Sequence, residues 1–134
     1  MISADRILKV LPVALCLLTA CPEKNAVWLE PGSSANHLAI HVADKKGGSK
    51  AVNVGLFRIV RCAVSHDAPA DSAMWVIDNI GSGKPMLITY AQAPLGFRTV
   101  TKPKPLVSGC YRAEISGRER LRFEIRSDVG VIER

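Results

Sequence analysis

Apolar and polar residues alternate along most of this chain with a period of two. A clear example is residues 37–42, where Leu38, Ile40 and Val42 alternate with polar or small residues. Successive side chains of an extended strand point to opposite faces, so this alternation predicts strands with one face against a core. No window keeps a helical period over three turns, and the chain is therefore predicted to be all-β.

The predicted strands follow one another at short intervals. Turn-forming residues separate them, such as the Pro-Gly-Ser-Ser sequence at 31–34 and the polar loop at 44–49. Within the longest run, residues 51–62, the alternation changes phase, which we interpret as a β-bulge near residues 55–57. The predicted strands are 27–30, 37–42, 51–62, 73–78, 85–91, 106–115, 120–126 and 129–132.

Seven or eight short strands at regular spacing are typical of an antiparallel β-sandwich. Trp75 lies between Cys62 and Cys110, and this order is similar to the Cys, Trp and Cys pattern of immunoglobulin domains, although Trp75 follows Cys62 closely. We therefore expect a β-sandwich of immunoglobulin-like architecture, with a small open β-barrel as the alternative. The chain shows no internal repeat and no sign of a second domain.

The first 21 residues depart from the strand pattern. Arg6 and Lys9 give a basic start, and residues 10–20 are almost entirely apolar. This run is about half of the ~20 residues that a membrane-spanning helix needs. A basic start followed by a short apolar run predicts a secretory signal peptide.

The signal peptide ends in Leu18, Thr19, Ala20 and Cys21. An aliphatic residue, two small residues and a cysteine resemble the lipobox of bacterial lipoproteins. The resemblance implies a diacylglyceryl group on Cys21 Sγ and cleavage before Cys21; the alternative is an ordinary secreted protein cut nearby. By analogy with Gram-negative lipoproteins, Pro22 at the next position favours the outer membrane, facing the periplasm. The implied organisation is a signal peptide at 1–20, a tether at 21–26 and one domain at 27–134.

Two cysteines remain for a disulfide once Cys16 leaves with the signal peptide and Cys21 carries lipid. Cys62 and Cys110 form an even pair in an oxidising compartment, and we predict that they are bonded. The bond would close a loop of about 50 residues and contribute roughly 4 kcal/mol in the chain-entropy model.

No catalytic or metal site is predicted. Ser65, His66 and Asp67 carry the residue types of a hydrolytic triad, but adjacent side chains diverge, whereas a triad joins residues from different elements. His37 and His41 would share one face of a strand about 13 Å apart, which is too far for one metal ion, and we expect both rings to face solvent. We therefore expect a protein that is not an enzyme and has no cofactor.

The chain is basic, with 18 Lys and Arg residues against 12 Asp and Glu residues and a net charge of +6. Only Asp5, Arg6 and Lys9 of these lie in the signal peptide, so nearly all of this charge stays on the domain. A basic surface suits anionic lipid headgroups, a cell-wall polymer or an acidic protein partner. Nucleic acid is not an expected partner of an exported protein.

Arginines crowd the two long C-terminal strands. If Leu121 and Phe123 face the core, the alternating arginines face outward on one side. A guanidinium group binds carboxylate or phosphate in a bidentate manner, whereas the alternative role of such charges is to protect a strand edge from aggregation. The candidate binding residues are Arg112, Arg118, Arg120, Arg122 and Arg126.

The segment from 62 to 123 also resembles a wider group of proteins. Its motifs at 75–77 (Trp-Val-Ile), 88–90 (Ile-Thr-Tyr) and 109–113 (Gly-Cys-Tyr-Arg-Ala) are similar to those of small bacterial envelope lipoproteins. The resemblance supplies no catalytic residue, and the group includes suspected immunity proteins of contact-dependent secretion systems, which block an incoming toxin in the periplasm. Our first hypothesis is a lipid-anchored envelope domain that binds a protein partner, with an immunity role as one version. The alternative is a binding module for an anionic envelope polymer or glycan that uses the arginines.

Overall fold

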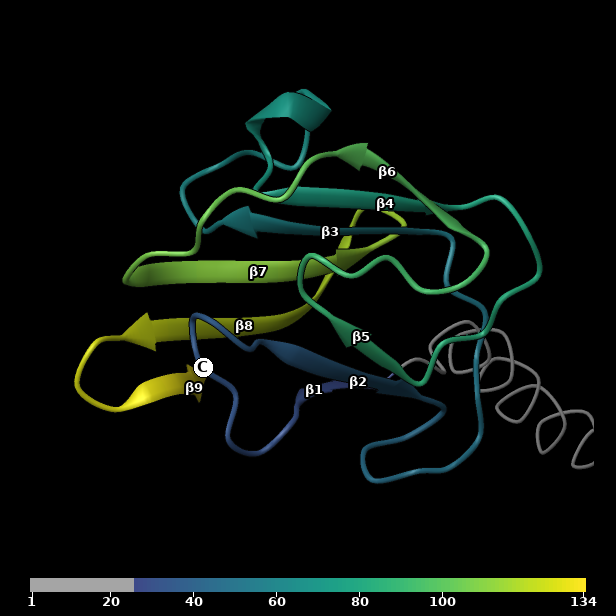
Figure 1. Ribbon diagram of the computed structural model, residues 1–134, viewed down its shortest axis with the longest axis horizontal. Coiled ribbons are helices and arrows are strands. Elements are labelled where there is room, and N and C mark those ends of the chain that lie inside the picture. Colours follow the sequence, from purple (N-terminus) through teal and green to yellow (C-terminus); the bar gives the residue numbers. More distant parts are fainter. Residues whose placement is uncertain (1–25) are drawn as a thin grey trace, which may run out of the picture.

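The computed structural model describes residues 26–134, and the predicted signal peptide and Cys21 lie outside them (Figure 1). The described residues form nine strands and one short 3₁₀ helix, η1 (Ala70–Ser72). The prediction of an all-β chain is confirmed. The strands are β1 (Ala26–Leu29), β2 (Ala39–Ala43), β3 (Leu56–Arg61), β4 (Trp75–Asn79), β5 (Leu87–Thr89), β6 (Phe97–Thr101), β7 (Gly109–Ile115), β8 (Arg118–Arg126) and β9 (Gly130–Glu133).

The strands form two antiparallel sheets. The smaller sheet has the order β1-β2-β5, and the larger has the order β6-β4-β3-β7-β8-β9. One apolar core contains residues of both sheets, so they pack face to face (Figure 1). The predicted β-sandwich is thus confirmed, and the two sheets do not close into a barrel.

Trp75 occupies the centre of the core between the sheets. Its ring meets Phe57 and Tyr90 edge to face, with ring centroids 6.0 and 5.3 Å apart. Ile40 and Ile88 of the smaller sheet are buried in the same cluster. Large aromatic side chains at such distances contribute both buried area and favourable ring contacts, so this cluster holds the two sheets together.

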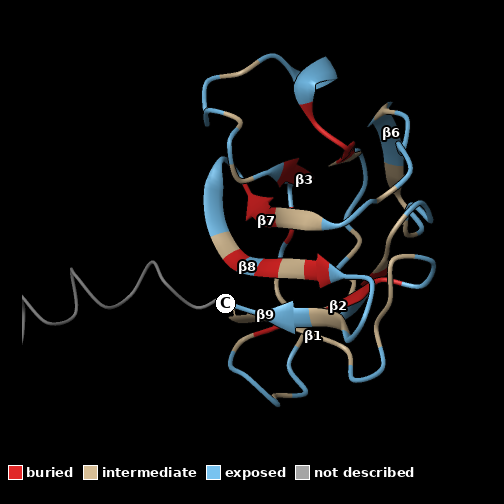
Figure 2. Cartoon of the chain, turned by 90° about the vertical axis from the view of Figure 1, so that its left-hand side faces the viewer, coloured by how far each residue is buried: buried red, intermediate tan, exposed pale blue. Residues whose placement is uncertain are grey.

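The β7–β8 hairpin follows the predicted alternation. Tyr111 and Phe123, on adjacent strands, are both fully buried, and their rings stack with centroids 5.7 Å apart. Figure 2 shows buried residues on both strands. Ser116 and Gly117 join the strands with φ values of 52° and 80°. Two positive φ values in a two-residue turn match the twist of the flanking strands.

The long strand predicted at 51–62 is wrong in its first half. β3 begins at Leu56, and residues 51–55 belong to no strand. The change of phase therefore marks the beginning of the strand instead of a bulge. The register shifts of the larger sheet lie at Val76–Ile77 and Ala113–Glu114.

β6 (Phe97–Thr101) is a strand that the hydrophobic pattern did not predict. It lies at the edge of the larger sheet, and Figure 2 shows it largely exposed. An edge strand that buries little has no strong alternation of apolar and polar residues. Its Thr-Val-Thr sequence did carry a signal, because β-branched residues favour strands.

The sandwich has two ends with different contents. The beginning of β1 and the ends of β2 and β4 lie at one end, on the right in Figure 1, and we call it the Ala26 end after the first residue of β1. The Asn79 side-chain amide joins two loops there by donating to the carbonyls of Val54 and Gly83, both at 2.8 Å. The opposite, distal end holds the β1–β2 loop, the β3–β4 loop and the β8–β9 turn.

Candidate functional site

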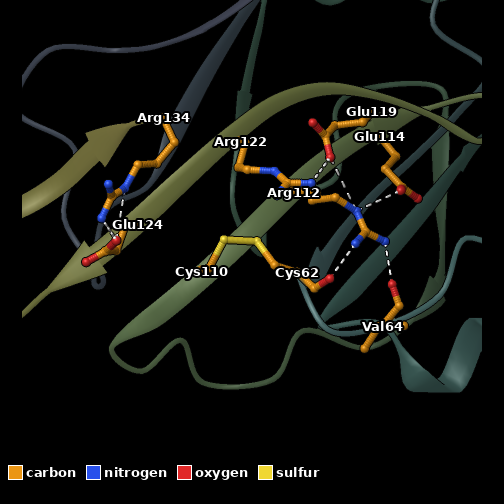
Figure 3. The surroundings of a disulfide bond; sticks show 9 residues. All are labelled: Cys62, Val64, Cys110, Arg112, Glu114, Glu119, Arg122, Glu124 and Arg134. Carbon is orange, nitrogen blue, oxygen red and sulfur yellow. Dashed lines mark hydrogen bonds and ion pairs between the residues drawn. A yellow bond between two sulfur atoms is a disulfide. The ribbon is translucent and has the colours of Figure 1, made fainter.

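The predicted disulfide between Cys62 and Cys110 is present at the distal end (Figure 3). The two Cα atoms are 5.4 Å apart, and the Cys62 amide donates to the Cys110 carbonyl at 3.0 Å. The bond therefore links neighbouring strands of one sheet at the start of the β3–β4 loop. In immunoglobulin domains the corresponding bond joins the two sheets instead.

Arg112 does not lie on an exposed basic face, and its prediction as a surface binding residue is wrong. It is only 4% exposed. Its guanidinium donates to the carbonyls of Cys62 at 2.8 Å and Val64 at 2.6 Å, and its Nε donates to Glu114 at 3.1 Å (Figure 3). A buried guanidinium with these partners holds the chain that follows the disulfide against the sheet.

Glu114 is the centre of a buried charged cluster. Its carboxylate is fully buried and accepts from Arg58 Nε at 2.5 Å, in addition to Arg112. His66 Nδ1 lies 2.7 Å from the same carboxylate, and Arg58 also donates to the His66 carbonyl at 2.8 Å. Buried charges are tolerated only when they are paired in this way. The cluster therefore pins the β3–β4 loop to the outer face of the larger sheet.

Arg112 and Glu114 lie on the face of β7 opposite Tyr111, as alternation along a strand requires, but the sequence did not show that this face is covered. The outer face of an antiparallel sheet is commonly solvated. Here the β3–β4 loop lies over it, and Val60 and Val76 are buried beneath the loop. Apolar residues on both faces of the run around Val60 were the available signal.

Ser65 and Asp67 form a local turn beside this cluster. The Asp67 amide donates to Ser65 Oγ at 3.2 Å. The His66 ring lies against the carboxylate of Glu114, which belongs to β7, and not against that of Asp67. The three adjacent residues thus do not form the arrangement of a triad among themselves.

Arg122 lies opposite Arg112 across the β7–β8 pair and is exposed. Its guanidinium donates to Glu119 at 2.7 Å. This hydrogen bond and the charge of Glu119 raise the pKa of Arg122. Arg118 is also exposed, at the beginning of β8. The outer face of the hairpin is consequently a mixed surface in which acidic residues accompany the arginines.

The C-terminal part of β8 has the same mixed character. Arg126 Nε lies 3.6 Å from Glu124 and 3.8 Å from Asp128. Glu124 also accepts a hydrogen bond from Arg134. Arg120 is half-buried, and its Nε is buried without a hydrogen-bond partner among the described residues. Of the five predicted arginines, Arg112 is buried, Arg120 is half-buried, and the other three, Arg118, Arg122 and Arg126, are exposed.

A pocket of about 460 Å³ opens at the distal end. Its apolar residues include Leu106 and Ile125, and Arg126 is the predicted binding residue that lines it. Hydroxyl and amide groups supply the rest of its polar surface. The pocket is lined by Ser34, Ala35, Asn36, Leu106, Val107, Ser108, Ile125, Arg126, Ser127 and Gly130.

Hydrogen bonds fix two walls of this pocket. Tyr111 OH donates to the Val107 carbonyl at 2.7 Å and accepts from the Val107 amide at 3.1 Å. In the β1–β2 loop, Ser34 and His37 exchange backbone hydrogen bonds of 3.0 and 3.1 Å. Segments held in this way form a preorganised site. The hydrophobic pattern did not reveal the pocket, because it joins three loops that lie far apart in the sequence.

The two histidines of the β2 region have different surroundings. His37 is exposed, as expected. His41 is half-buried, so the expectation of a solvent-facing ring is wrong for it. Its ring stacks on Trp28 with centroids 5.0 Å apart and forms a hydrogen bond with Glu30. Cross-strand pairs of this kind stabilise the small sheet.

Within residues 26–134 there is no group of three or more His, Cys, Asp or Glu side chains placed to hold a metal ion. The same part of the chain contains no helix with the length and apolar character needed to cross a bilayer. Comparisons with protein-family models, curated proteins and solved structures gave no match.

Proposed function

We propose that this chain is a lipid-anchored protein of the bacterial cell envelope that binds a protein partner at its distal end. The lipobox at residues 18–21 supports the anchor, and the Cys62–Cys110 disulfide agrees with an oxidising compartment. The observation that carries the proposal is the position of the pocket. The pocket opens at the distal end of the sandwich. Ala26, through which the chain from the proposed anchor enters the domain, lies at the other end.

The chemistry of the pocket suits a protein segment. Leu106 and Ile125 offer an apolar surface, and Val107, which also lines the pocket, is 49% exposed. Binding energy at protein interfaces concentrates where an anchor side chain fills such a pocket and polar groups surround it. Arg126 lines the same pocket with Glu124 and Asp128 within 4 Å, so its polar edge carries charges of both signs, and we propose a partner segment with an apolar anchor side chain.

The envelope location leaves more than one biological role. The resemblance at residues 62–123 to small envelope lipoproteins favours an immunity role, in which the partner is an incoming toxin. Such a protein would act from the periplasmic face of the outer membrane, by occupying a surface of the toxin. The proposal assigns binding to the domain and no chemical step.

Binding of an anionic envelope polymer through the arginines is less well supported. That hypothesis needs a continuous basic face. Arg112 is buried, and both Arg122 and Arg126 have carboxylates within 4 Å. Neutralised arginines attract an anionic polymer only weakly.

A photo-crosslinking amino acid placed at Ser127 in growing cells tests the proposal. We expect one protein adduct of defined mass, and we expect Ser108→Trp to abolish it by filling the pocket. The same crosslinker at Asn53, exposed at the Ala26 end, is the matched control and should not give this adduct. An adduct that survives Ser108→Trp, or binding to lipopolysaccharide alone that falls with salt, would overturn the proposed site.

A further inference from the structure

We infer that the Ala26 end of the sandwich is a membrane-docking surface that rests on anionic lipid headgroups. The inference depends on the proposed anchor at Cys21. The inference adds an orientation, because an anchor alone would leave the domain free to rotate on its tether. The observations that carry it are the shortness of the tether and the side chains gathered at this end.

The tether restricts the domain to the membrane surface. Cys21 precedes Ala26 by five residues. An extended chain spans at most about 3.5 Å per residue, so Ala26 stays within about 17 Å of the anchored sulfur. The loops beside Ala26 are thereby the part of the domain that meets headgroups most often.

A lysine-rich turn lies beside Ala26. Ala26 pairs with Ala43, the last residue of β2, and the turn that follows presents Lys45, Lys46 and Lys50, all exposed. Backbone hydrogen bonds within the turn, of 2.8 and 3.1 Å, hold its shape. The turn therefore presents three ammonium groups from one rigid loop at this end.

Two apolar loop tips lie at the same end of the sandwich. Leu95 is 97% exposed and Ile80 is 65% exposed, the two largest values among large hydrophobic residues of the described chain. The Ile80 amide donates to the Gly96 carbonyl at 2.9 Å, so the two loops touch. Lys84 follows in the same loop and is exposed. Apolar tips flanked by lysines are the side-chain pattern of interfacial membrane binding.

Acidic residues at this end do not cancel its charge. Asp78 lies 3.5 Å from Arg98, and Glu119 accepts from Arg122. Asp44 is half-buried in the lysine-rich turn. The lysines thus outnumber the unpaired carboxylates, and a lysine close to an anionic membrane strengthens binding by roughly fivefold. In the docked orientation, the distal pocket faces away from the membrane.

Lysine footprinting on vesicles tests the docking. The acylated mature protein, residues 21–134, is purified from membranes and reconstituted in phosphatidylcholine vesicles with or without one quarter phosphatidylglycerol. Modification of its lysine amines by an acylating reagent is then read by mass spectrometry. We expect Lys45, Lys46 and Lys84 to react at least threefold more slowly on the anionic vesicles. Lys102, exposed beyond β6 at the opposite end, is the control and should react equally on both.

A pair of matched variants separates the apolar contribution. The double variant Ile80→Ser and Leu95→Ser should lose the protection, whereas Val129→Ser, an exposed apolar residue at the distal end, should keep it. Protein that floats with anionic vesicles while all four lysines react equally on both would overturn the docking and leave the anchor standing. Protein that does not float with either vesicle would overturn the anchor, and with it the proposed function.

Discussion

Arg58 and Glu114, 56 residues apart in the chain, form a 2.5 Å ion pair on the covered outer face of the larger sheet. Both are buried, and Arg112 approaches the same carboxylate from the other side. The pair joins β3 to β7 and fixes the loop that lies over them. Because the surroundings exclude water, removal of either partner leaves a charge that cannot be solvated.

Glu114→Gln should therefore reduce the free energy of unfolding by about 3 kcal/mol, because two buried guanidinium groups lose their counter-charge. Denaturant titration measures the loss. Glu119→Gln is the matched control, since Glu119 also pairs with an arginine but is partly exposed, and it should cost under about 1 kcal/mol. Equal losses for the two variants would contradict a structural role of the buried cluster.

Replacing both Cys62 and Cys110 with Ala should lower the free energy of unfolding by about 4 kcal/mol, since the bond closes a long loop in the unfolded chain. The residues are 48 positions apart. The double variant should also exchange amide hydrogens faster in the β3–β4 loop, because the buried cluster is then its main attachment. A change smaller than about 1 kcal/mol would show that the loop-closure argument does not hold here.

Burial raises the pKa of Tyr90 to about 12. A tyrosine in the unfolded chain titrates near pH 10, so the folded state holds this proton more tightly. The resulting stabilisation is complete below about pH 10 and is lost as the pH rises through 12, by about 1–2 kcal/mol after allowance for partial exposure. Absorbance titration and unfolding between pH 8 and 12 would measure both effects.

Tyr90→Phe is the control for this pH dependence. It should be less stable at neutral pH, since the hydroxyl donates to the Lys104 carbonyl at 2.6 Å and lies 3.1 Å from the Met74 carbonyl. Its stability should then fall less steeply than that of the native protein above pH 10. An unchanged slope in this variant would assign the alkaline loss to other groups.

Gly117→Ala should destabilise the protein by about 1 kcal/mol, since Gly117 has a φ of 80° in the β7–β8 turn. No atom lies within 4 Å of the added methyl group, so the cost is purely conformational. Gly55→Ala is the matched control, because the φ of Gly55 is not positive and the nearest atom to the added methyl group is at an ordinary 3.6 Å. Thermal unfolding should show a lower melting temperature for Gly117→Ala than for Gly55→Ala, and equal values would contradict backbone strain at Gly117.

The sequence predicted the sandwich because strands with one buried face leave a period-two pattern, as in residues 121–125. It also predicted the disulfide, because Cys62 and Cys110 are the pair that remains when Cys16 is assigned to the signal peptide and Cys21 to the lipid anchor. It missed β6, which buries too little to produce a pattern. It extended β3 through residues 51–55, which alternate without pairing to a neighbour strand.

The candidate sites were harder to predict, because they depend on loops. Arg112 has the position of a surface residue in the alternating pattern, but the β3–β4 loop covers it in the folded domain. The pocket joins three segments whose proximity follows from the pairing of β1, β7 and β8 with their neighbours. Local patterns contain no information about such distant contacts, and only the tertiary arrangement shows that Arg126 lines a cavity while Arg122 lies on an open face.

The intact mass of the protein purified from membranes, with and without reduction, tests the account most directly. We predict the mass of residues 21–134 plus acyl chains, increasing by two hydrogens on reduction of Cys62–Cys110. The acyl chains would place the domain on the membrane through Cys21, as both the envelope function and the docking surface require. A mass without acyl chains would contradict the lipid anchor and remove the basis for both.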